Sequence, residues 1–310
     1  MRREPGPRAG GRRAVVVLRI VAVTALPWAW FGLRDALGLA GDVLAIFLPA
    51  LAVVAAVGLV VVNRRLGVPP AVSVLLAGAV AVAGPWTPAD AGAVAPGRGV
   101  TVAGANVTGM PGTLPALRGV DPDVLAVVED APELDAQLAP DRPYHLAARA
   151  PGIGVYSSFP LRPLERPGPD FPGIRAVVAA PTPFVVYALH VPKPWVPVGS
   201  GYFTSPANHH RLVTEVAARV ARERRPVVIL GDLNSTDRAR DYRLLTGGTG
   251  LTDAMRDGWA GPTSVTTWLP LLLRIDHVLV GPGWCGDAGR RFTLPGSDHD
   301  GVVATVGPCS

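Results

Sequence analysis

The chain has 310 residues, of which 49% are hydrophobic and 17% charged, and that much apolar surface excludes a disordered protein. Its net charge of +5 and sequence pI near 9.7 would, taken alone, favour a phosphate-rich partner. However, residues 1–84 hold nine arginines against three acids, a net of +6, whereas the remaining residues hold 20 basic and 21 acidic groups. The C-terminal two thirds therefore lack the basic surplus of a nucleic-acid-binding protein.

An Arg-rich N-terminus, residues 1–13, precedes a predicted membrane anchor over residues 14–86. The anchor contains apolar runs at 14–33, 43–62 and 68–86. Each run is close to the ~20 residues with which a helix crosses the hydrocarbon core of a bilayer. The second run has no charged residue, which argues against the alternative of a buried core helix. We therefore expect transmembrane helices here.

The arginines around these runs predict the orientation of the chain. Five precede the first run and Arg64 and Arg65 lie between the second and third, whereas Arg34 stands alone between the first two. The positive-inside rule places the N-terminus in the cytoplasm, so that three crossings leave the C-terminal domain outside the cell. If the first run is a cleaved signal peptide instead, two spans still leave that domain outside. We expect a multi-pass protein of the cell membrane with a linker (87–97) and an extracellular catalytic domain (98–310).

The cysteines, Cys285 and Cys309, lie near the C-terminus. In an oxidising compartment two thiols that are close in the fold often pair. Two unpaired core thiols are an equally good interpretation, and the sequence leaves both open.

From Val100 onward the sequence has short runs rich in Val and Ile, separated by Gly and Pro, as in the strands of a buried sheet. One clear helix interrupts them, with Ser205 as N-cap, Pro206 as first helical residue and an apolar face up to about Glu223. Many strands with a few helices predict a layered α/β sandwich. The predicted strands cover 100–107, 120–129, 152–158, 174–180, 184–191, 226–234, 273–281 and 301–306, and weaker helix candidates cover 131–139 and 239–246.

Polar residues recur where these strands end, and ionisable groups there are costly unless they bind something. Carboxylates and amides gathered at one edge favour Mg²⁺ or Mn²⁺ over zinc. Each motif alone has an ordinary explanation, such as an Asx turn for GDLN or a satisfied core histidine for the one that ends YALH. The ordered set, from residue 106 to residue 299, is more specific. It consists of Asn106, Glu129, His190, Asp232, Asn234, Asp276, Asp298 and His299.

Over residues 98–307 this ordered set resembles the endonuclease/exonuclease/phosphatase superfamily. The segments GVYSSFPL (154–161) and GLTDAMR (250–256) are similar to two further family segments. The resemblance implies a four-layer α/β/β/α sandwich, as in deoxyribonucleases, behind the N-terminal transmembrane helices. It also implies a hydrolase of phosphoric esters or anhydrides that depends on Mg²⁺ or Mn²⁺.

The resemblance further implies roles for single residues. Glu129 would be the main metal ligand, with Asn106 beside it and Asp298 as an additional carboxylate near the metal. Asp232 would position or deprotonate the attacking water. The remaining catalytic residues would be Asn234, which contacts the phosphate, His190, which stabilises the pentacovalent phosphorus, and the pair Asp276 and His299.

The chain also departs from the family. Thr108 stands where some nucleases carry a second carboxylate, and Asp300 and Gly301 follow the SDH motif where the family often has x-Pro. The first departure weakens the interpretation as a nuclease. The active-site tyrosine of the family has three candidates, Tyr144, Tyr156 and Tyr187.

Two apolar segments bear on the substrate. WLPLLLR (268–274) is either a buried core strand or a hydrophobic lip that faces lipid, and KPWVPVGSGYF (193–203) offers three aromatic side chains. An aromatic, Pro-rich loop beside a phosphohydrolase site, on a domain tethered to a membrane, favours an amphiphilic phosphate ester. We expect Trp195 and Trp268 to contact the substrate.

The expected function is that of a membrane-anchored phosphohydrolase acting on a lipid-linked phosphate or pyrophosphate, without a stable nucleic-acid partner. Three N-terminal spans before such a domain are similar to an actinobacterial subgroup associated with teicoplanin-type glycopeptide resistance. That similarity implies an undecaprenyl-pyrophosphate-like substrate. The alternatives are an extracellular nuclease acting on DNA and a non-catalytic binding module. The retained metal-ligand Glu and GD-x-N pair favour catalysis over the latter.

Overall fold

The structure is a computed structural model. It describes residues 9–33, 35–62, 64, 67–89, 91–195, 201–258, 260–264 and 271–310. By its contacts the chain divides into two compact units, Met1–Gly84 and Pro85–Ser310, and each is described by itself.

The first unit contains the helices α1 (Ala9–Leu33), α2 (Gly38–Val62) and α3 (Val68–Ala83), at the places of the three predicted apolar runs. Among the described residues, α2 and the stretch Val68–Trp86 are long and apolar enough to cross a membrane. Length and composition alone support that reading, which matches two of the three predicted spans.

These helices contact one another through small residues and through a polar side-chain contact. Gly78 of α3 approaches α2 so closely that an added Cβ would lie 2.9 Å from the Cβ of Ala52. Between α1 and α3, Nε1 of Trp28 donates a hydrogen bond of 3.1 Å to Oγ of Ser73. Close backbone approach and satisfied polar side chains are typical of helices that pack in an apolar medium.

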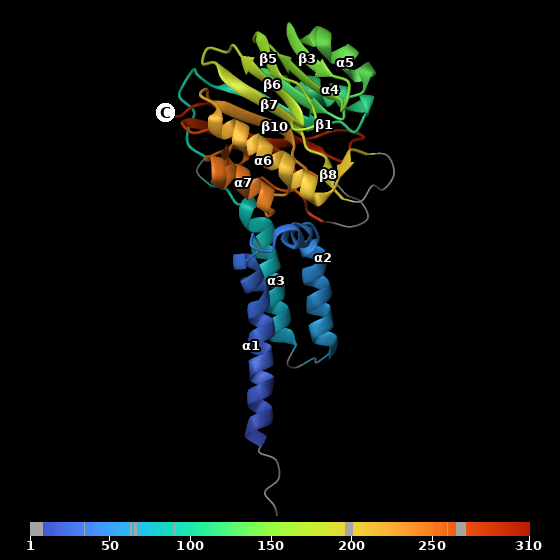
Figure 1. The fold of residues 1–310 in the computed structure, drawn as a ribbon, viewed down its shortest axis with the longest axis vertical. Helices are drawn as coiled ribbons and strands as arrows, with labels where there is room; N and C mark the ends of the chain where they lie inside the picture. Colours follow the sequence, from blue (N-terminus) through green and yellow to red (C-terminus); the bar gives the residue numbers. More distant parts are fainter. Residues whose placement is uncertain are drawn as a thin grey trace, which may run out of the picture. The chain divides into compact units, whose positions relative to one another are not determined.

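The described part of the second unit forms two six-stranded sheets (Figure 1). The first has the order β13-β14-β1-β2-β4-β3, with β1 (Val100–Asn106), β2 (Val124–Val128), β3 (Tyr144–Ala148), β4 (Ile153–Ser157), β13 (Trp284–Thr293) and β14 (Asp300–Pro308). The second has the order β11-β12-β10-β7-β6-β5, with β5 (Leu161–Glu165), β6 (Gly173–Val178), β7 (Phe184–His190), β10 (Val227–Asp232), β11 (Thr252–Asp253) and β12 (Asp276–Val280). A separate ribbon pairs β8 (Lys193–Pro194) with β9 (Phe203–Thr204).

The two sheets pack face to face on a core of Val, Ile and Ala side chains drawn from both. Helices α4 (Leu114–Val120) and α5 (Pro132–Leu138) pack on the outer face of the first sheet. Helices α6 (Pro206–Arg222) and α7 (Arg240–Thr249) cover the second sheet (Figure 1). This is the predicted four-layer α/β/β/α sandwich.

Helix α6 illustrates how the sequence sets an element. Oγ of Ser205 accepts a hydrogen bond of 3.2 Å from the backbone N–H of Asn208, as an N-cap does. Leu212, Val216 and Val220 are buried on the face that packs against the second sheet. The spacing of four residues between them keeps them on one face, as in an amphipathic helix.

The described residues of the segment that was expected to link the two units pack on the edge of the first sheet. The N–H of Ala95 donates to the carbonyl of Pro308 at 2.8 Å. Next to this contact a disulfide joins Cys285 and Cys309, whose Cα atoms lie 5.0 Å apart. The structure thereby selects the paired alternative for the two cysteines.

Candidate active site

The predicted polar residues meet at one edge of the sandwich because of the strand directions. Strands β1 and β2 are parallel, as are β7 and β10, so the carboxyl ends of each pair lie together. Asn106, His190 and Asp232 are the last residues of β1, β7 and β10. Strand β12 runs antiparallel to β10 and begins at this edge with Asp276, the register partner of Asp232.

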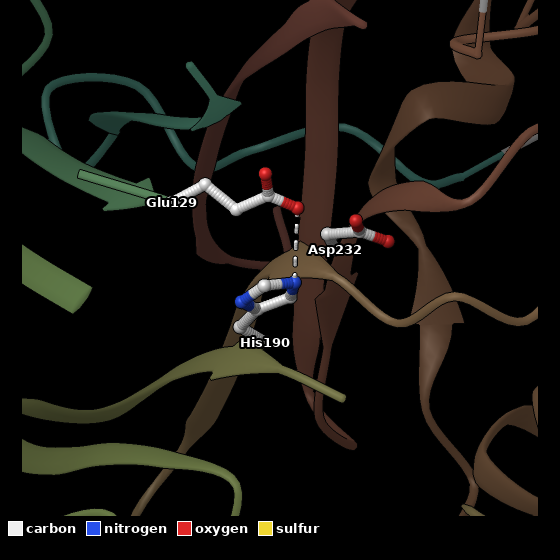
Figure 2. Close-up of side chains that lie close together, drawn as sticks. All are labelled: Glu129, His190 and Asp232. Atoms are coloured by element: carbon white, nitrogen blue, oxygen red, sulfur yellow. Dashed lines mark ion pairs between the residues drawn. The ribbon is translucent and has the colours of Figure 1, made fainter. Parts of the chain in front are cut away.

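Hydrogen bonds from one amide connect the two sheets at this edge. Nδ2 of Asn106 donates to Oε1 of Glu129 at 3.1 Å and to Oδ2 of Asp232 at 3.0 Å. Nε2 of His190 lies 3.5 Å from the same Oε1 (Figure 2). Glu129 directly follows β2 and has a positive φ of 53°, a backbone conformation that is uncommon outside glycine and is often found at functional sites.

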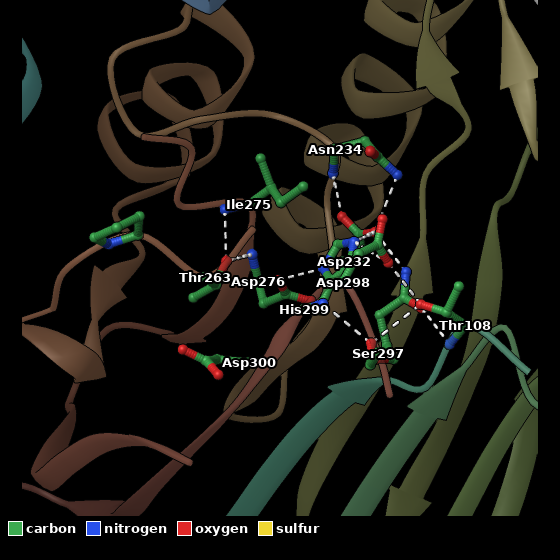
Figure 3. Close-up of polar contacts among 12 residues, drawn as sticks. Thr108, Asp232, Asn234, Thr263, Ile275, Asp276, Ser297, Asp298, His299 and Asp300 are labelled. Atoms are coloured by element: carbon green, nitrogen blue, oxygen red, sulfur yellow. Dashed lines mark hydrogen bonds and ion pairs between the residues drawn. The ribbon is translucent and has the colours of Figure 1, made fainter. Parts of the chain in front are cut away.

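The turn after β10 positions Asn234 over Asp232 (Figure 3). Oδ1 of Asp232 accepts the N–H of Asn234 at 2.7 Å, and Nδ2 of Asn234 donates to the carbonyl of Val191 at 2.9 Å. Gly231 has φ +126°, and an added Cβ would lie 2.2 Å from the carbonyl oxygen of Leu189. The glycine of the GDLN motif therefore allows β7 and β10 to approach closely at the site.

A buried ion pair forms the other side of the site (Figure 3). Nδ1 of His299 lies 2.8 Å from Oδ2 of Asp276, and its Nε2 lies 3.9 Å from Oδ2 of Asp232. Oγ1 of Thr263 accepts hydrogen bonds from the N–H groups of Ile275 and Asp276, at 3.0 and 3.1 Å. The threonine fixes the backbone that carries the carboxylate. Its role has no signature in the sequence.

Asp298, also predicted for the metal site, lies at the more exposed rim. Its Oδ1 accepts a hydrogen bond of 2.7 Å from Oγ1 of Thr108. The N–H of Thr108 in turn donates to Oδ1 of Asn106 at 3.0 Å. Where some family members have a second carboxylate, Thr108 thus connects Asp298 to the amide that binds Glu129.

Burial and neighbouring charges give three side chains different protonation states. Burial raises the pKa of Asp232 to about 7, and the Asp276 carboxylate raises it too. Burial lowers the pKa of His190 to about 4, so its ring is neutral at pH 7. Burial also disfavours the charged form of His299, but Asp276 outweighs it and raises the pKa of His299 to about 10. The site thus combines a proton acceptor with a charged donor.

The donor set fits a divalent cation. Ligand atoms of Glu129, His190 and Asp232 lie within 4.8 Å of one another, and so do those of Asp232, Asp276 and His299. Among the described residues, both ring nitrogens of the buried His190 and Oδ1 of Asp276 have no hydrogen-bond partner. Buried polar atoms without a partner are expected where a bound group supplies one. Carboxylate and amide oxygens are suited to Mg²⁺ or Mn²⁺.

The three tyrosines considered from the sequence lie away from this edge. Tyr144 is exposed on β3, Tyr156 donates to Asp130 and is held by Asp135, and Tyr187 packs in the core beneath α6. Instead, the ring of Tyr202 lies beside His190, with ring centroids 4.9 Å apart. Tyr202 and Lys193, whose Nζ lies 3.8 Å from Oε1 of Glu129, are the site neighbours that the predicted set lacked.

Of the two tryptophans expected to bind substrate, one lies within the described residues. Trp195 follows β8 and its residue is 39% exposed. Trp268 lies outside the described residues. Of the segment 268–274, the described part precedes β12 and is not a core strand, since Leu272 is 39% exposed.

Arg274, the last residue of this segment, is fully buried although its side chain is charged. Its Nε donates to Oδ2 of Asp237 at 2.9 Å, and its Nη2 is paired with Asp253. The arginine of the R-I-D-H motif therefore ties the loop before β12 to the turn before α7 and to β11. The sequence offered one signal for this, a charged residue inside an apolar run.

The fold and this edge define a phosphoesterase with a candidate metal site. A model of the Endonuclease/Exonuclease/phosphatase family matches residues 112–299. The match spans more than half of the chain, and the chain belongs to this family. No curated protein matches the chain.

Solved structures share the fold at low sequence identity. The human Nocturnin catalytic domain is 11% identical with a TM-score of 0.54, over 68% of this chain and 94% of that chain. A functionally unknown conserved protein from Enterococcus faecalis is 15% identical with a TM-score of 0.52, over 67% and 99%. An endonuclease/exonuclease/phosphatase from Bacteroides vulgatus is 15% identical with a TM-score of 0.50, over 68% and 99%.

Proposed function

We propose that this protein is a membrane-anchored, divalent-metal-dependent phosphohydrolase that acts at the outer face of the membrane on a lipid-linked phosphate or pyrophosphate. The observation that carries the proposal is the fully buried Asp232, which lies between the pair Glu129 and His190 and the pair Asp276 and His299. Its raised pKa suits a group that accepts a proton near neutral pH.

Each residue of the site has a distinct role in the proposed reaction. Glu129, flanked by Asn106 and Asp298, would hold a divalent cation, which polarises phosphoryl oxygens and lowers the pKa of water. Asp232, oriented by Asn234 and Asn106, positions the attacking water and accepts its proton. The donors around it neutralise the charge that develops on the phosphoryl oxygens. They are Asn234, the neutral His190 and the charged His299, which Asp276 holds in place.

Three observations support the location and the kind of substrate. Two apolar helices have the length and composition of membrane spans, and the second unit has a disulfide, as proteins outside the cytoplasm often do. The second unit is close to neutral, which disfavours a polyanion such as DNA. On the resemblance of the N-terminal sequence to a glycopeptide-resistance subgroup, we extend the proposal to an undecaprenyl-pyrophosphate-like lipid and a contribution to such resistance.

Phosphate release from a substrate panel tests the proposal. The full chain in detergent is incubated with Mg²⁺ or Mn²⁺ and with polyprenyl pyrophosphate, a phospholipid, an inositol phosphate or DNA. We expect release from polyprenyl pyrophosphate by the wild type and none by Asp232→Asn. Trp195→Ala and Trp268→Ala should raise KM for the lipid substrate and leave KM for a short-chain analogue unchanged.

Two outcomes would overturn this assignment. Salt-sensitive cleavage of DNA without phosphate release from polyprenyl pyrophosphate would make the protein a surface nuclease. A cellular phenotype that survives both Glu129→Ala and Asp232→Ala would make it a binding module.

A further inference from the structure

Lys193 is the only lysine of the chain, and the family pattern found in the sequence does not use it. Its Nζ lies 3.8 Å from Oε1 of Glu129. Oε1 also accepts the hydrogen bond from Asn106 and faces Nε2 of His190. A fixed positive charge therefore stands beside the carboxylate at the centre of the candidate site.

The backbone around Lys193 is held from two sides. Its N–H donates to the carbonyl of Tyr202 at 2.7 Å, within the ribbon of β8 and β9. The carbonyl of the preceding Pro192 accepts a hydrogen bond of 2.8 Å from Nδ1 of His209 on α6. The ring of Tyr202 contacts His190. The backbone of Lys193 is thus fixed, while its ammonium group reaches Glu129 on a flexible side chain.

Its contact with Glu129 does not explain why a lysine stands there. The side chains of Lys193 and Glu129 are 29% and 23% exposed, and their atoms lie 3.8 Å apart. Partly exposed pairs at such distances contribute little to stability. Asn106 already orients Glu129 through a shorter hydrogen bond of 3.1 Å. Lys193 is therefore available for a ligand, and it is partly exposed whereas the neighbouring His190 and Asp232 are fully buried.

We propose that Lys193 is a specificity-determining residue that binds a second phosphate group next to the scissile one, so that the site prefers a phosphoric anhydride to a phosphodiester. The inference rests on the proposed hydrolase function and names the substrate class of the same site. A diester phosphate carries one negative charge, whereas a terminal pyrophosphate carries at least two. A lysine, as a compact point charge, favours the latter without demanding one geometry.

The reaction on such a substrate balances. The water oxygen forms a bond to the terminal phosphorus, and the bond from that phosphorus to the bridging oxygen breaks. The electron pair stays on the bridging oxygen of the leaving phosphate, and one proton of the water passes to Asp232. Lys193 keeps its proton throughout and neutralises the charge that the leaving phosphate gains.

The test compares substrates across charge-matched variants of the full chain in detergent. Farnesyl pyrophosphate, farnesyl phosphate and bis(p-nitrophenyl) phosphate supply an anhydride, a monoester and a diester. Lys193→Met should raise KM for the pyrophosphate by about tenfold to a hundredfold, as expected for loss of a charged hydrogen bond. The loss of kcat/KM should exceed that for the diester by at least about tenfold. Lys193→Arg should restore most of the preference. Arg118→Met, which removes one charge from α4, is the matched control.

A binding measurement separates this inference from the proposed function. Titration calorimetry compares methylenediphosphonate with methylphosphonate, and Lys193→Met should weaken binding of the former alone. Equal losses of kcat/KM for all three substrates, or an unchanged KM for the pyrophosphate, would overturn the role of Lys193 and leave the hydrolase function standing. If the wild type releases no phosphate while Lys193→Met still weakens diphosphonate binding selectively, the function fails and the binding role holds.

Discussion

Oδ2 of Asp276 lies 2.8 Å from Nδ1 of His299, and the two residues are 0% and 2% exposed. In so buried a position the carboxylate decides the charge of the ring. We expect Asp276→Asn to keep the shape of the pair and lower kcat by about a hundredfold or more, with a smaller change in KM. Steady-state phosphate release measures both. A kcat close to that of the wild type would remove His299 from the proposed chemistry.

Glu129 is the predicted principal metal ligand. Glu129→Gln keeps the size of the side chain and removes its charge, so we expect Mn²⁺ to bind at least about tenfold more weakly. Titration calorimetry measures the affinity, and EDTA should abolish the activity of the wild type. Glu133→Gln, the same change on an exposed part of α5, should bind Mn²⁺ like the wild type. Equal affinities for both variants would place the metal elsewhere.

The buried Arg274 should make the second unit sensitive to acid. Burial alone would raise the pKa of Asp253, but Arg274 outweighs it and the pKa is lowered. Asp253 therefore stabilises the fold above its unfolded-state pKa of about 4, and that contribution is lost as the pH falls through the lower folded pKa. Asp253→Asn should lower the free energy of unfolding at pH 7 by about 3–5 kcal/mol, because it leaves the buried Arg274 charge with one partner fewer.

Urea unfolding of residues 85–310, whose three hydrophobic clusters all lie within that unit, measures this effect. Below pH 4 the stability of the wild type should fall more steeply than that of Asp253→Asn. Asp170→Asn, in a pair whose carboxylate is 67% exposed, is the control and should change stability by less than about 1 kcal/mol. Parallel pH curves for wild type and Asp253→Asn would contradict the assignment.

The disulfide between Cys285 and Cys309 closes a loop with a sequence separation of 24. Replacing both cysteines by serine should lower the free energy of unfolding by about 3 kcal/mol, chiefly because the unfolded chain gains freedom. Thermal unfolding with and without dithiothreitol provides the measurement. The reductant should shift Tm of the wild type and leave Tm of the double variant in place.

The central strands could be predicted because both of their faces are buried. Strands β1, β2, β7 and β10 are short apolar runs, and a polar residue marks the point where each reaches the sandwich edge. Edge strands lack this signal. Strand β5 contains a proline and two charged residues, and β13 is buried only over its first three residues, with several charges in its more exposed remainder. Exposed edges favour such residues, so neither strand was expected.

The site residues that could be predicted lie at the ends of buried strands, whereas those that were missed do not. His190 and Asp232 are placed by strand ends, which a sequence shows. Lys193 begins β8 and Tyr202 directly precedes β9, and the pairing of these two short strands has no periodic signal in the sequence. The one available signal for Lys193 was its being the sole lysine of the chain.

Strand β10 pairs with β7 on one side and β12 on the other, so that Asp232 has His190 and Asp276 as its two register partners. The backbone hydrogen bonding of the second sheet therefore sets the spacing of these three side chains. A one-residue slip would move all of them to other faces. The ribbon that carries Lys193 lies outside that ladder. Replacing the β8–β9 ribbon by a different sequence should therefore change which ligands bind and leave the geometry around Asp232 unchanged.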